Sequence, residues 1–186
     1  MTVPSTLDAR FRDAAATAGL VDVAYDLLDT PIGTLLVAAG DAGLCRISFD
    51  PEPEREVESL ARTLGTRVLR VSRPVDDARR QLDEYFDGKR RQFELRTDLR
   101  PLAEFNRVVL AELVRVPYGS TATYGQLAVR VDHPRAARAV GTVMNRNPIP
   151  IVLPCHRVIG ANGKLVGYGG GLDRKEHLLR LEGALL

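Results

Sequence analysis

The sequence predicts an α+β protein in two parts: a small N-terminal α/β domain and a mostly helical C-terminal domain with a helix-turn-helix. Before residue 100, short apolar runs are separated by glycine and proline turns and interrupted by two helical patterns. After Pro101, apolar residues recur every three to four positions, which is typical of helices. A chain of 186 residues with 45% hydrophobic content can form this core.

The predicted boundaries follow these changes in pattern. We expect an N-terminal extension over residues 1–20, an N-terminal domain over 21–99 and a C-terminal domain over 100–186. The extension could form a short helix, but its apolar stripe is weak and its role stays open. Within the N-terminal domain, strands are expected at 21–29, 34–39, 44–50, 67–71 and 92–99, and helices at 52–65 and 75–89.

Cys45 belongs to the alternating pattern of the third predicted strand. With Ile47 and Phe49 it occupies one face of that strand, which we take as the inward face. Because cysteine often acts as a small buried hydrophobic residue, we expect Cys45 to be structural.

The C-terminal domain begins with three predicted helices. The face shared by Phe105, Val109, Leu113 and Val116 predicts a helix over 102–116. Two shorter helices are expected over 121–131 and 134–147, and together they would form the helix-turn-helix. Asp132 is the expected N-cap of the last helix, with Pro134 near its first turn.

The third of these helices is unusual in its side chains. Arg135 and Arg138 project from a stretch that is otherwise rich in small residues, namely Ala136, Ala137, Ala139 and Gly141. A helix that reads the major groove usually carries longer polar side chains. Small residues would let the backbone approach a target closely, but a tightly packed internal helix would favour them as well.

The last forty residues contain a second unusual pattern. A glycine-rich turn at 167–171 leads into a helix expected to end near Glu182 and to stop at Gly183. Asp173 and Glu176 have the spacing of a capping box. Glu182 lies four residues after Leu178, on the apolar side, where a carboxylate is costly without a partner. The alternative is a glutamate at the helix end that reaches water.

The run from Ile149 to Val158 ends in chemistry that a buried segment does not need. It places Cys155, His156 and Arg157 directly after aliphatic residues and prolines. An ordinary thiol is mostly protonated at neutral pH, so a reactive one needs a base or a positive charge nearby. Cys155, His156 and Glu182 could form a relay of nucleophile, base and orienting group. Adjacency in sequence does not establish this, because neighbouring side chains often diverge.

Composition narrows the setting. Residues 101–186 carry 11 Lys or Arg and 6 Asp or Glu, a net charge of +5, whereas residues 1–100 carry −3. This permits a polyanionic partner for the C-terminal half. We find no apolar run long enough for a membrane span and no secretory signal. Two cysteines cannot make a disulfide framework or a four-thiolate metal site, so we expect a cytoplasmic protein with reduced thiols.

Three segments together resemble a known family. They are "PYGSTATYGQLA", "RAARAVGTVMNRNPIP" and "PIPIVLPCHRVIGANGKLVGYGGGLDRKEHLLRLEG". In the same order they resemble the O6-alkylguanine-DNA alkyltransferases, also called methylated-DNA–protein-cysteine methyltransferases. The resemblance is dense from about Phe105 to Gly183 and loose in the N-terminal half, where it implies an RNase H-like domain.

The resemblance implies a DNA repair protein that moves an alkyl group from O6 of guanine onto its own cysteine, once per molecule. Cys155 matches that acceptor and His156 the base, which works through a water. Glu182 matches the orienting carboxylate, and Asn147 the asparagine that ties the recognition helix to the active site. Tyr124 matches a tyrosine whose hydroxyl donates to N3 of the base. No cofactor and no metal are implied.

The remaining matches concern the lesion pocket and DNA. Backbone groups of Cys155, Val158 and Gly169 match those that hold the guanine, and Met144 and Tyr168 match apolar walls. The implied partner is double-stranded DNA containing O6-alkylguanine, bound through the minor groove, with the nucleotide flipped out. Arg138 matches the arginine that replaces the flipped base. The matching DNA-binding residues around it are Arg135, Ala136, Ala137 and Gly141. We expect a monomer, and copies lining up on DNA and O4-alkylthymine as a substrate stay open.

Departures and rival readings remain. Leu110 stands where the family commonly has tryptophan, from which we expect a packing change. A structural zinc, which some relatives bind, is not expected from the cysteines and histidines present. The main alternative is a lesion-binding protein without transfer activity, but such relatives replace the cysteine that Cys155 matches. A transcription factor would not explain the Pro-Cys-His-Arg-Val block. A cysteine hydrolase, the third alternative, would turn over repeatedly, so the stoichiometry of the reaction separates it from an alkyltransferase.

Overall fold

The computed structural model describes residues 5–185, and the chain divides into two compact units. The first contains residues up to 85 together with 94–101, and the second contains residues 86–93 together with those from 102 onward. Segment 86–93 therefore belongs to the second unit, although residues of the first unit flank it in sequence. Within the described residues, no helix is both long enough and apolar enough to cross a membrane.

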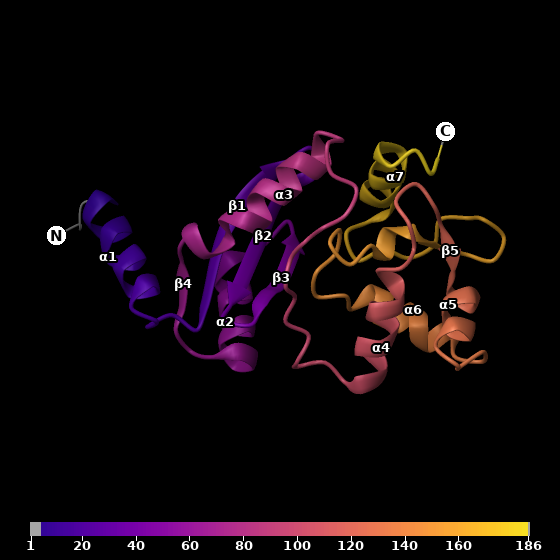
Figure 1. Cartoon of the computed structure of the whole chain (residues 1–186), viewed down its shortest axis with the longest axis horizontal. Helices are drawn as coiled ribbons and strands as arrows, with labels where there is room; N and C mark the ends of the chain where they lie inside the picture. The colour runs from indigo at the N-terminus through magenta and orange to yellow at the C-terminus, as the bar shows by residue number, and fades with distance from the viewer. Residues whose placement is uncertain (1–4, 186) are drawn as a thin grey trace. The chain divides into compact units, whose positions relative to one another are not determined.

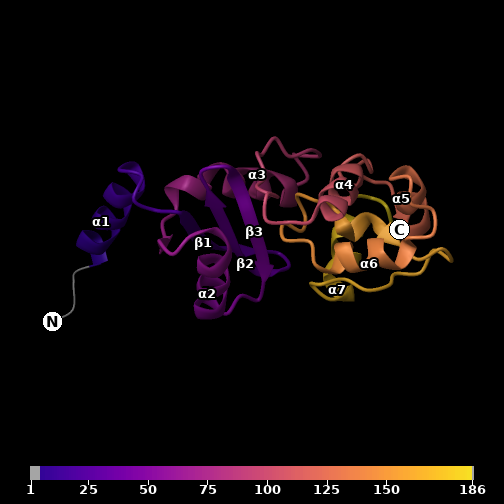
Figure 2. The ribbon, with the colours of Figure 1, turned by 90° about the horizontal axis from the view of Figure 1, so that it is seen from below.

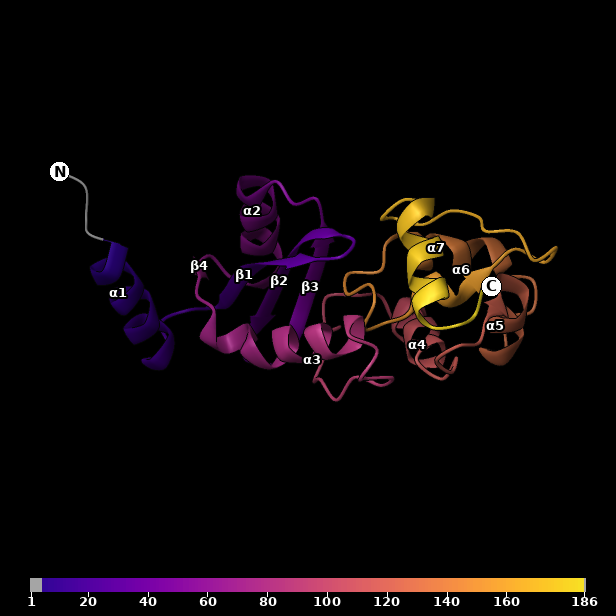
Figure 3. The same cartoon turned by 90° about the horizontal axis from the view of Figure 1, so that it is seen from above.

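The first unit is built on a four-stranded mixed sheet of order β3-β2-β1-β4. β1 (Val23–Thr30), β2 (Gly33–Gly40) and β3 (Gly43–Phe49) form an antiparallel meander, and β4 (Val68–Arg70) pairs parallel with β1 (Figure 1). α2 (Pro53–Leu64) and α3 (Asp76–Phe86) lie on opposite faces of this sheet (Figures 2 and 3). A 3₁₀ turn, η1 (Arg73–Val75), precedes α3.

The alternation of β-strand side chains produces a core on each face of the sheet. On the α2 side, Leu60 packs with Val23, Leu36, Ala38 and Cys45. Cys45 lies on this inward face, as predicted, and its thiol donates a hydrogen bond to Ala38 O at 3.2 Å. Burial raises the pKa of this thiol to about 12, so it stays protonated and inert.

The strand predicted at 92–99 does not form. One isolated bridge joins Thr97 to Leu44, supported by hydrogen bonds between Leu44 and the backbone of Arg96 and Asp98. The apolar alternation in "QFELRTDL" is real, but the segment leaves the second unit at Phe93 and runs beside β3 only briefly. Strand propensity alone therefore did not decide the structure of this segment, which pairs with β3 at a single bridge.

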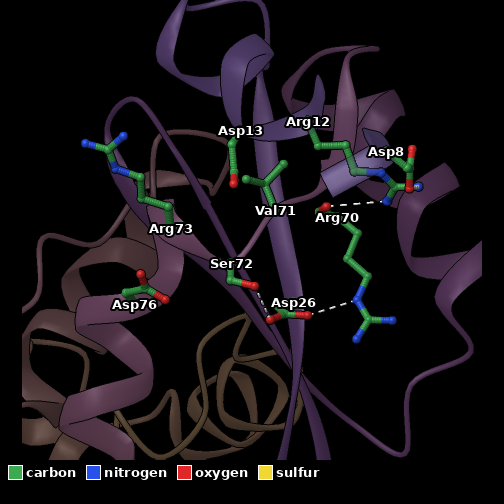
Figure 4. Close-up of a pocket in the computed structure, with 9 residues that line it drawn as sticks. All are labelled: Asp8, Arg12, Asp13, Asp26, Arg70, Val71, Ser72, Arg73 and Asp76. Carbon is green, nitrogen blue, oxygen red and sulfur yellow. Dashed lines mark hydrogen bonds and ion pairs between the residues drawn. The ribbon is translucent and has the colours of Figure 1, made fainter. Parts of the chain in front are cut away.

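The N-terminal extension contains α1 (Ser5–Thr17). Its Arg12 side chain donates to Arg70 O at 3.4 Å, and the Arg73 guanidinium reaches Thr17 Oγ1 at 3.5 Å. Arg12, Arg70 and Arg73 line a cavity together with Asp26, as Figure 4 shows. The cavity has a volume of about 490 Å³. Arg70 Nε and Ser72 Oγ donate to Asp26 at 2.9 and 2.7 Å, and Arg79 also pairs with it.

The second unit contains the predicted helix-turn-helix. α4 (Glu104–Leu113) packs beside α5 (Tyr124–Arg130) and α6 (Ala137–Asn145), as Figure 2 shows. Val109, Leu113 and Val116 are fully buried, as the predicted helix face requires. Leu110 is also in this core, at 1% exposure. Two strands of two residues, β5 (Ala122–Thr123) and β6 (Val158–Ile159), pair in parallel, η2 (Cys155–Arg157) precedes β6, and α7 (Leu172–Leu181) ends the unit.

Two predicted helix caps are wrong, and one cap was missed. Asp132 has a φ of +60°, so it lies in the turn, and α6 begins at Ala137 with Ala136 as N-cap. Arg135 therefore precedes the helix instead of projecting from it. Asp173 is not a cap either, because α7 begins at Leu172 after Gly171. The capping box lies in α5, where Thr123 and Gln126 exchange hydrogen bonds of 2.7 and 3.1 Å.

Gly43, at the turn between β2 and β3, is predicted to tolerate no side chain. Its φ is +126°, and an added Cβ would lie 2.3 Å from Arg96 O. We expect Gly43→Ala to lower the free energy of unfolding by about 3 kcal/mol or more, measured by urea titration. Gly19→Ala is the matched control, because its φ is +70° but no atom lies within 4 Å of an added Cβ. It should cost only about 1 kcal/mol, and equal losses would contradict the steric explanation.

Candidate active site

Cys155 is positioned by a tight turn over residues 147–153 and not by a β-strand. Leu153 N–H donates to Ile149 O at 2.9 Å, and Ile149 N–H donates to Asn147 Oδ1 at 3.0 Å. Ile151, between them, is fully buried with a φ of +75°, which is rare for a β-branched residue. Packing therefore holds a strained backbone directly before the thiol, a feature that clusters at functional sites.

The Cys155 thiol is nearly inaccessible and is held by one amide. Its residue is 4% exposed, and Asn147 Nδ2 lies 3.1 Å from Sγ while also donating to Leu153 O at 2.7 Å. Burial raises the pKa of the thiol to about 11, although the Asn147 amide and the nearby Lys175 ammonium lower it in part. The thiol is therefore protonated at neutral pH, so the site needs a base.

His156 is in the form that a base requires. Its ring is fully buried, and Nε2 lies 2.8 Å from Glu182 Oε1. Burial lowers the pKa of the imidazole, and the bond to Glu182 offsets this in part, so the ring is neutral at pH 7. Because the ionised Glu182 can only accept, Nε2 carries the proton. Nδ1 is then the basic atom, and among the described residues it has no hydrogen-bond partner.

Glu182 is buried as an ion because Arg157 pairs with it. The Arg157 guanidinium donates through Nε at 2.8 Å and through Nη2 at 2.9 Å to the two carboxylate oxygens, and through Nη1 to Val116 O at 2.7 Å. Such a two-point contact is the strongest form of this ion pair. Burial raises the pKa of Glu182, but the bonds from His156 and Arg157 outweigh it and bring the pKa to about 2.

Lys175 is a residue of this site that sequence reasoning missed. It is fully buried on α7, and its ammonium donates to Val158 O at 2.6 Å, Val166 O at 2.9 Å and Gly167 O at 3.4 Å. Burial lowers the pKa of this amine to about 8, while the Cys155 thiolate would raise it. The signal was present: Lys175 lies on the same apolar stripe of α7 as Leu178 and Glu182.

Tyr124 joins the cluster through a shared carbonyl. Its hydroxyl donates to Val166 O at 3.2 Å, the oxygen that Lys175 also binds. Burial raises the pKa of this phenol, and the nearby Cys155 raises it further, so it is a hydrogen-bond donor at neutral pH. Gly141 of α6 faces its ring, since an added Cβ there would lie 3.8 Å from two ring carbons.

The predicted pocket residues take different positions. Met144 and Val158 are buried, and the Val158 carbonyl accepts from Lys175 while keeping a second lone pair. Tyr168 is half-buried, and burial raises the pKa of its hydroxyl well above the ordinary value. Gly169 is exposed, and an added Cβ would lie 3.4 Å from Asn145 O at the end of α6.

The structure brings together Cys155, Asn147, His156 and Glu182, with Tyr124 alongside, but it does not bring the predicted DNA-binding arginines to them. Arg138 on α6 and Arg135 in the preceding turn are both exposed. Ala136 and Ala137 are partly buried at the start of that helix. The two arginines therefore lie on the protein surface, whereas Cys155, His156 and Glu182 are buried.

The α1 cavity is a weaker candidate. Its lining has three arginines and four aspartates, whose charges nearly cancel, and Asp26 is fully engaged by its partners (Figure 4). Across residues 5–185, no three His, Cys, Asp or Glu side chains gather closely enough to hold a metal ion. The cysteine cluster is therefore the candidate active site.

Comparison with known families covers both units. Residues 23–99 match the profile of the 6-O-methylguanine DNA methyltransferase ribonuclease-like domain, and residues 104–184 match that of its DNA binding domain. The first match agrees with the RNase H-like domain expected from the sequence. The second spans the helix-turn-helix and the cysteine cluster.

Individual relatives agree with these matches. The methylated-DNA–protein-cysteine methyltransferase of Methanosarcina barkeri is 43% identical over 85% of this chain and 96% of its own. That of Mycolicibacterium paratuberculosis is 44% identical over 86% and 92%. The crystal structure of Mycobacterium tuberculosis OGT in complex with DNA has a TM-score of 0.75 at 40% identity, covering 87% of this chain and 93% of that one.

The depressed pKa of Glu182 predicts a window of acid sensitivity. Its pKa falls from an ordinary 4.5 to about 2 on folding, so the stability it adds is present above pH 4.5 and is lost as the pH falls toward 2. The shift corresponds to about 3 kcal/mol. We expect Glu182→Gln to be less stable than the wild type at pH 7, and the gap to shrink by about this amount across the window in urea titrations. The other carboxylates are common to both proteins and cancel, and a constant gap would contradict the prediction.

Proposed function

Because the chain belongs to the 6-O-methylguanine DNA methyltransferase family, we propose that it repairs DNA by moving an alkyl group from O6 of guanine to Sγ of its own Cys155. The observation that carries this is the buried thiol at 3.1 Å from Asn147, followed in the same 3₁₀ turn by a neutral imidazole that an ionised carboxylate orients. Relatives with the same chemistry in their names cover most of the chain.

The reaction balances within the site. His156 Nδ1, through a water, takes the thiol proton, and the thiolate attacks the alkyl carbon. An S–C bond forms, and the C–O6 bond breaks with its electron pair going to guanine. Restored guanine needs a proton at N1 that the lesion lacks, so the proton lost by the thiol is the one that the product gains. The thioether is not reversed by water, so each molecule acts once.

Tyr124 and Asn147 have distinct roles in this proposal. Tyr124 turns its hydroxyl from Val166 O toward N3 of the base, where a donor stabilises the leaving guanine. The Asn147 amide, fixed by three hydrogen bonds, orients Sγ and supports its negative charge. The backbones of Cys155, Val158 and Gly169 hold the guanine edge, between Met144 and Tyr168.

The DNA-binding role falls to the helix-turn-helix. We propose that α6 enters the minor groove of double-stranded DNA, where Ala136 and Ala137 permit close approach and Arg135 contacts the backbone, whereas Gly141 gives space to the Tyr124 ring. Arg138 takes the place of the flipped nucleotide, since the reacting atom lies inside the stack. The exposure of both arginines supports this assignment. We further propose action as a monomer in the cytoplasm, where the two free thiols would stay reduced.

The first test is the intact mass of the protein after incubation with a duplex that contains one O6-methylguanine. We expect the mass of one methyl group to be added per protein, at Cys155, because the thioether is stable. Cys155→Ser should show no addition. A protein that binds the lesion tightly without gaining mass would be a lesion binder. Repeated turnover would indicate a hydrolase.

The role of Arg138 is tested by comparing two substrates. We expect Arg138→Ala to slow repair of duplex DNA by about a hundredfold, because flipping loses its inserted side chain. Reaction with free O6-benzylguanine should be unchanged, since that base needs no flipping. Arg146→Ala, which removes another exposed arginine just beyond α6, is the control. Equal losses on both substrates would exclude the inserted role.

A further inference from the structure

Segment 86–93 supplies an arginine to the neighbourhood of the relay. Arg91 Cζ lies 5.6 Å from the centroid of the Tyr118 ring. Arg157 Cζ lies 5.8 Å from the same centroid. An aromatic ring attracts a guanidinium within about 6 Å of its centroid, so one ring contacts two cations. One of them, Arg157, is the partner of Glu182.

The turn that carries Tyr118 also binds the end of α7. The Tyr118 hydroxyl donates to Leu181 O at 3.0 Å, and Gly119 N–H donates to Glu182 Oε2 at 3.4 Å. Gly119 has a φ of +74°, and an added Cβ would lie 2.9 Å from Glu182 O. The same turn therefore touches Glu182 through its backbone and Arg157 through an aromatic ring.

We propose that Tyr118 is a positioning residue for the transfer reaction, held in place by Arg91, and that it keeps Arg157 and Glu182 in the geometry that orients His156. Tyr118 does not touch the reacting atoms. Its ring contacts Arg157, its hydroxyl holds Leu181 directly before Glu182, and its neighbour Gly119 binds the Glu182 carboxylate. Glu182 in turn sets the tautomer of His156. This inference rests on the proposed function of Cys155.

The arrangement predicts how the rate of transfer depends on pH. The charged groups around His156 are Glu182 and Lys175 from α7 and Arg157 from its own turn. Burial lowers the pKa of His156, and the bond to Glu182 raises it. When Glu182 is less well placed, the pKa of His156 falls further and the base becomes weaker. The rate at neutral pH then falls, and the acidic limb of the pH profile moves to lower pH.

The test uses the full-length protein and free O6-benzylguanine, which removes DNA binding from the measurement. Single-turnover rates at Cys155 are followed across pH for Arg91→Ala, Arg91→Lys and Tyr118→Leu. We expect Arg91→Ala and Tyr118→Leu to slow the reaction by roughly three- to tenfold and to move the acidic limb downward. Arg91→Lys should recover most of the rate, because a cation remains near the ring.

Lys89→Ala is the matched control, because it also removes one positive charge from segment 86–93. In the wild type, the Lys89 ammonium pairs with Asp87. The profile of Lys89→Ala should match the wild type. Melting temperatures of all variants separate positioning from unfolding. If Arg91→Ala and Tyr118→Leu keep the wild-type profile, the inference is wrong while the proposed function stands. If the wild type itself does not alkylate Cys155, the proposed function fails first.

Discussion

The ionised carboxylate of Glu182, buried between His156 and Arg157, is the constraint on which the rest of the site depends. An unpaired charge at this depth would cost several kcal/mol, so its partners must be placed well. His156 and Arg157 must follow each other in one 3₁₀ turn. Arg157 can then pair with the carboxylate, and His156 can donate Nε2–H to it, which fixes the orientation of the imidazole. α7 must also end at Glu182, which places Lys175 two turns earlier in the same interior.

The parts of this site that obey local rules could be predicted from the sequence. Cys155 beside His156 is visible in a single motif, and Glu182 was singled out because a carboxylate lay on an apolar stripe. Lys175 carried the same signal, but a lysine on an apolar stripe commonly buries its stem and keeps its head in water, so the pattern alone does not mark it as a site residue. Tyr118 and Arg91 could not be found this way. Their contact joins residues 27 positions apart through loops, which have no periodicity to read.

The fold shows the same division. The helices and the first four strands follow from periodicity, and the family profiles agree with the α+β class and the helix-turn-helix. Errors arose where tertiary structure overrode a local preference. Asp132 is a good N-cap by residue type but adopts a left-handed conformation in the turn. Residues 92–99 alternate like a strand, yet the chain changes from the second unit to the first after Phe93, and only the bridge between Thr97 and Leu44 forms among the described residues.

The burial of the Cys155 thiol also affects how long an unreacted molecule stays active. Oxidants and stray electrophiles attack an accessible thiolate, and this sulfur is protonated and 4% exposed. A protein that can act once would be wasted by a single accidental reaction, because a thioether offers no way back. Because the thiol stays protonated until a base removes its proton, each molecule is kept for reaction with its substrate. The fold therefore protects the sulfur from reactions away from DNA as well as holding it for the transfer.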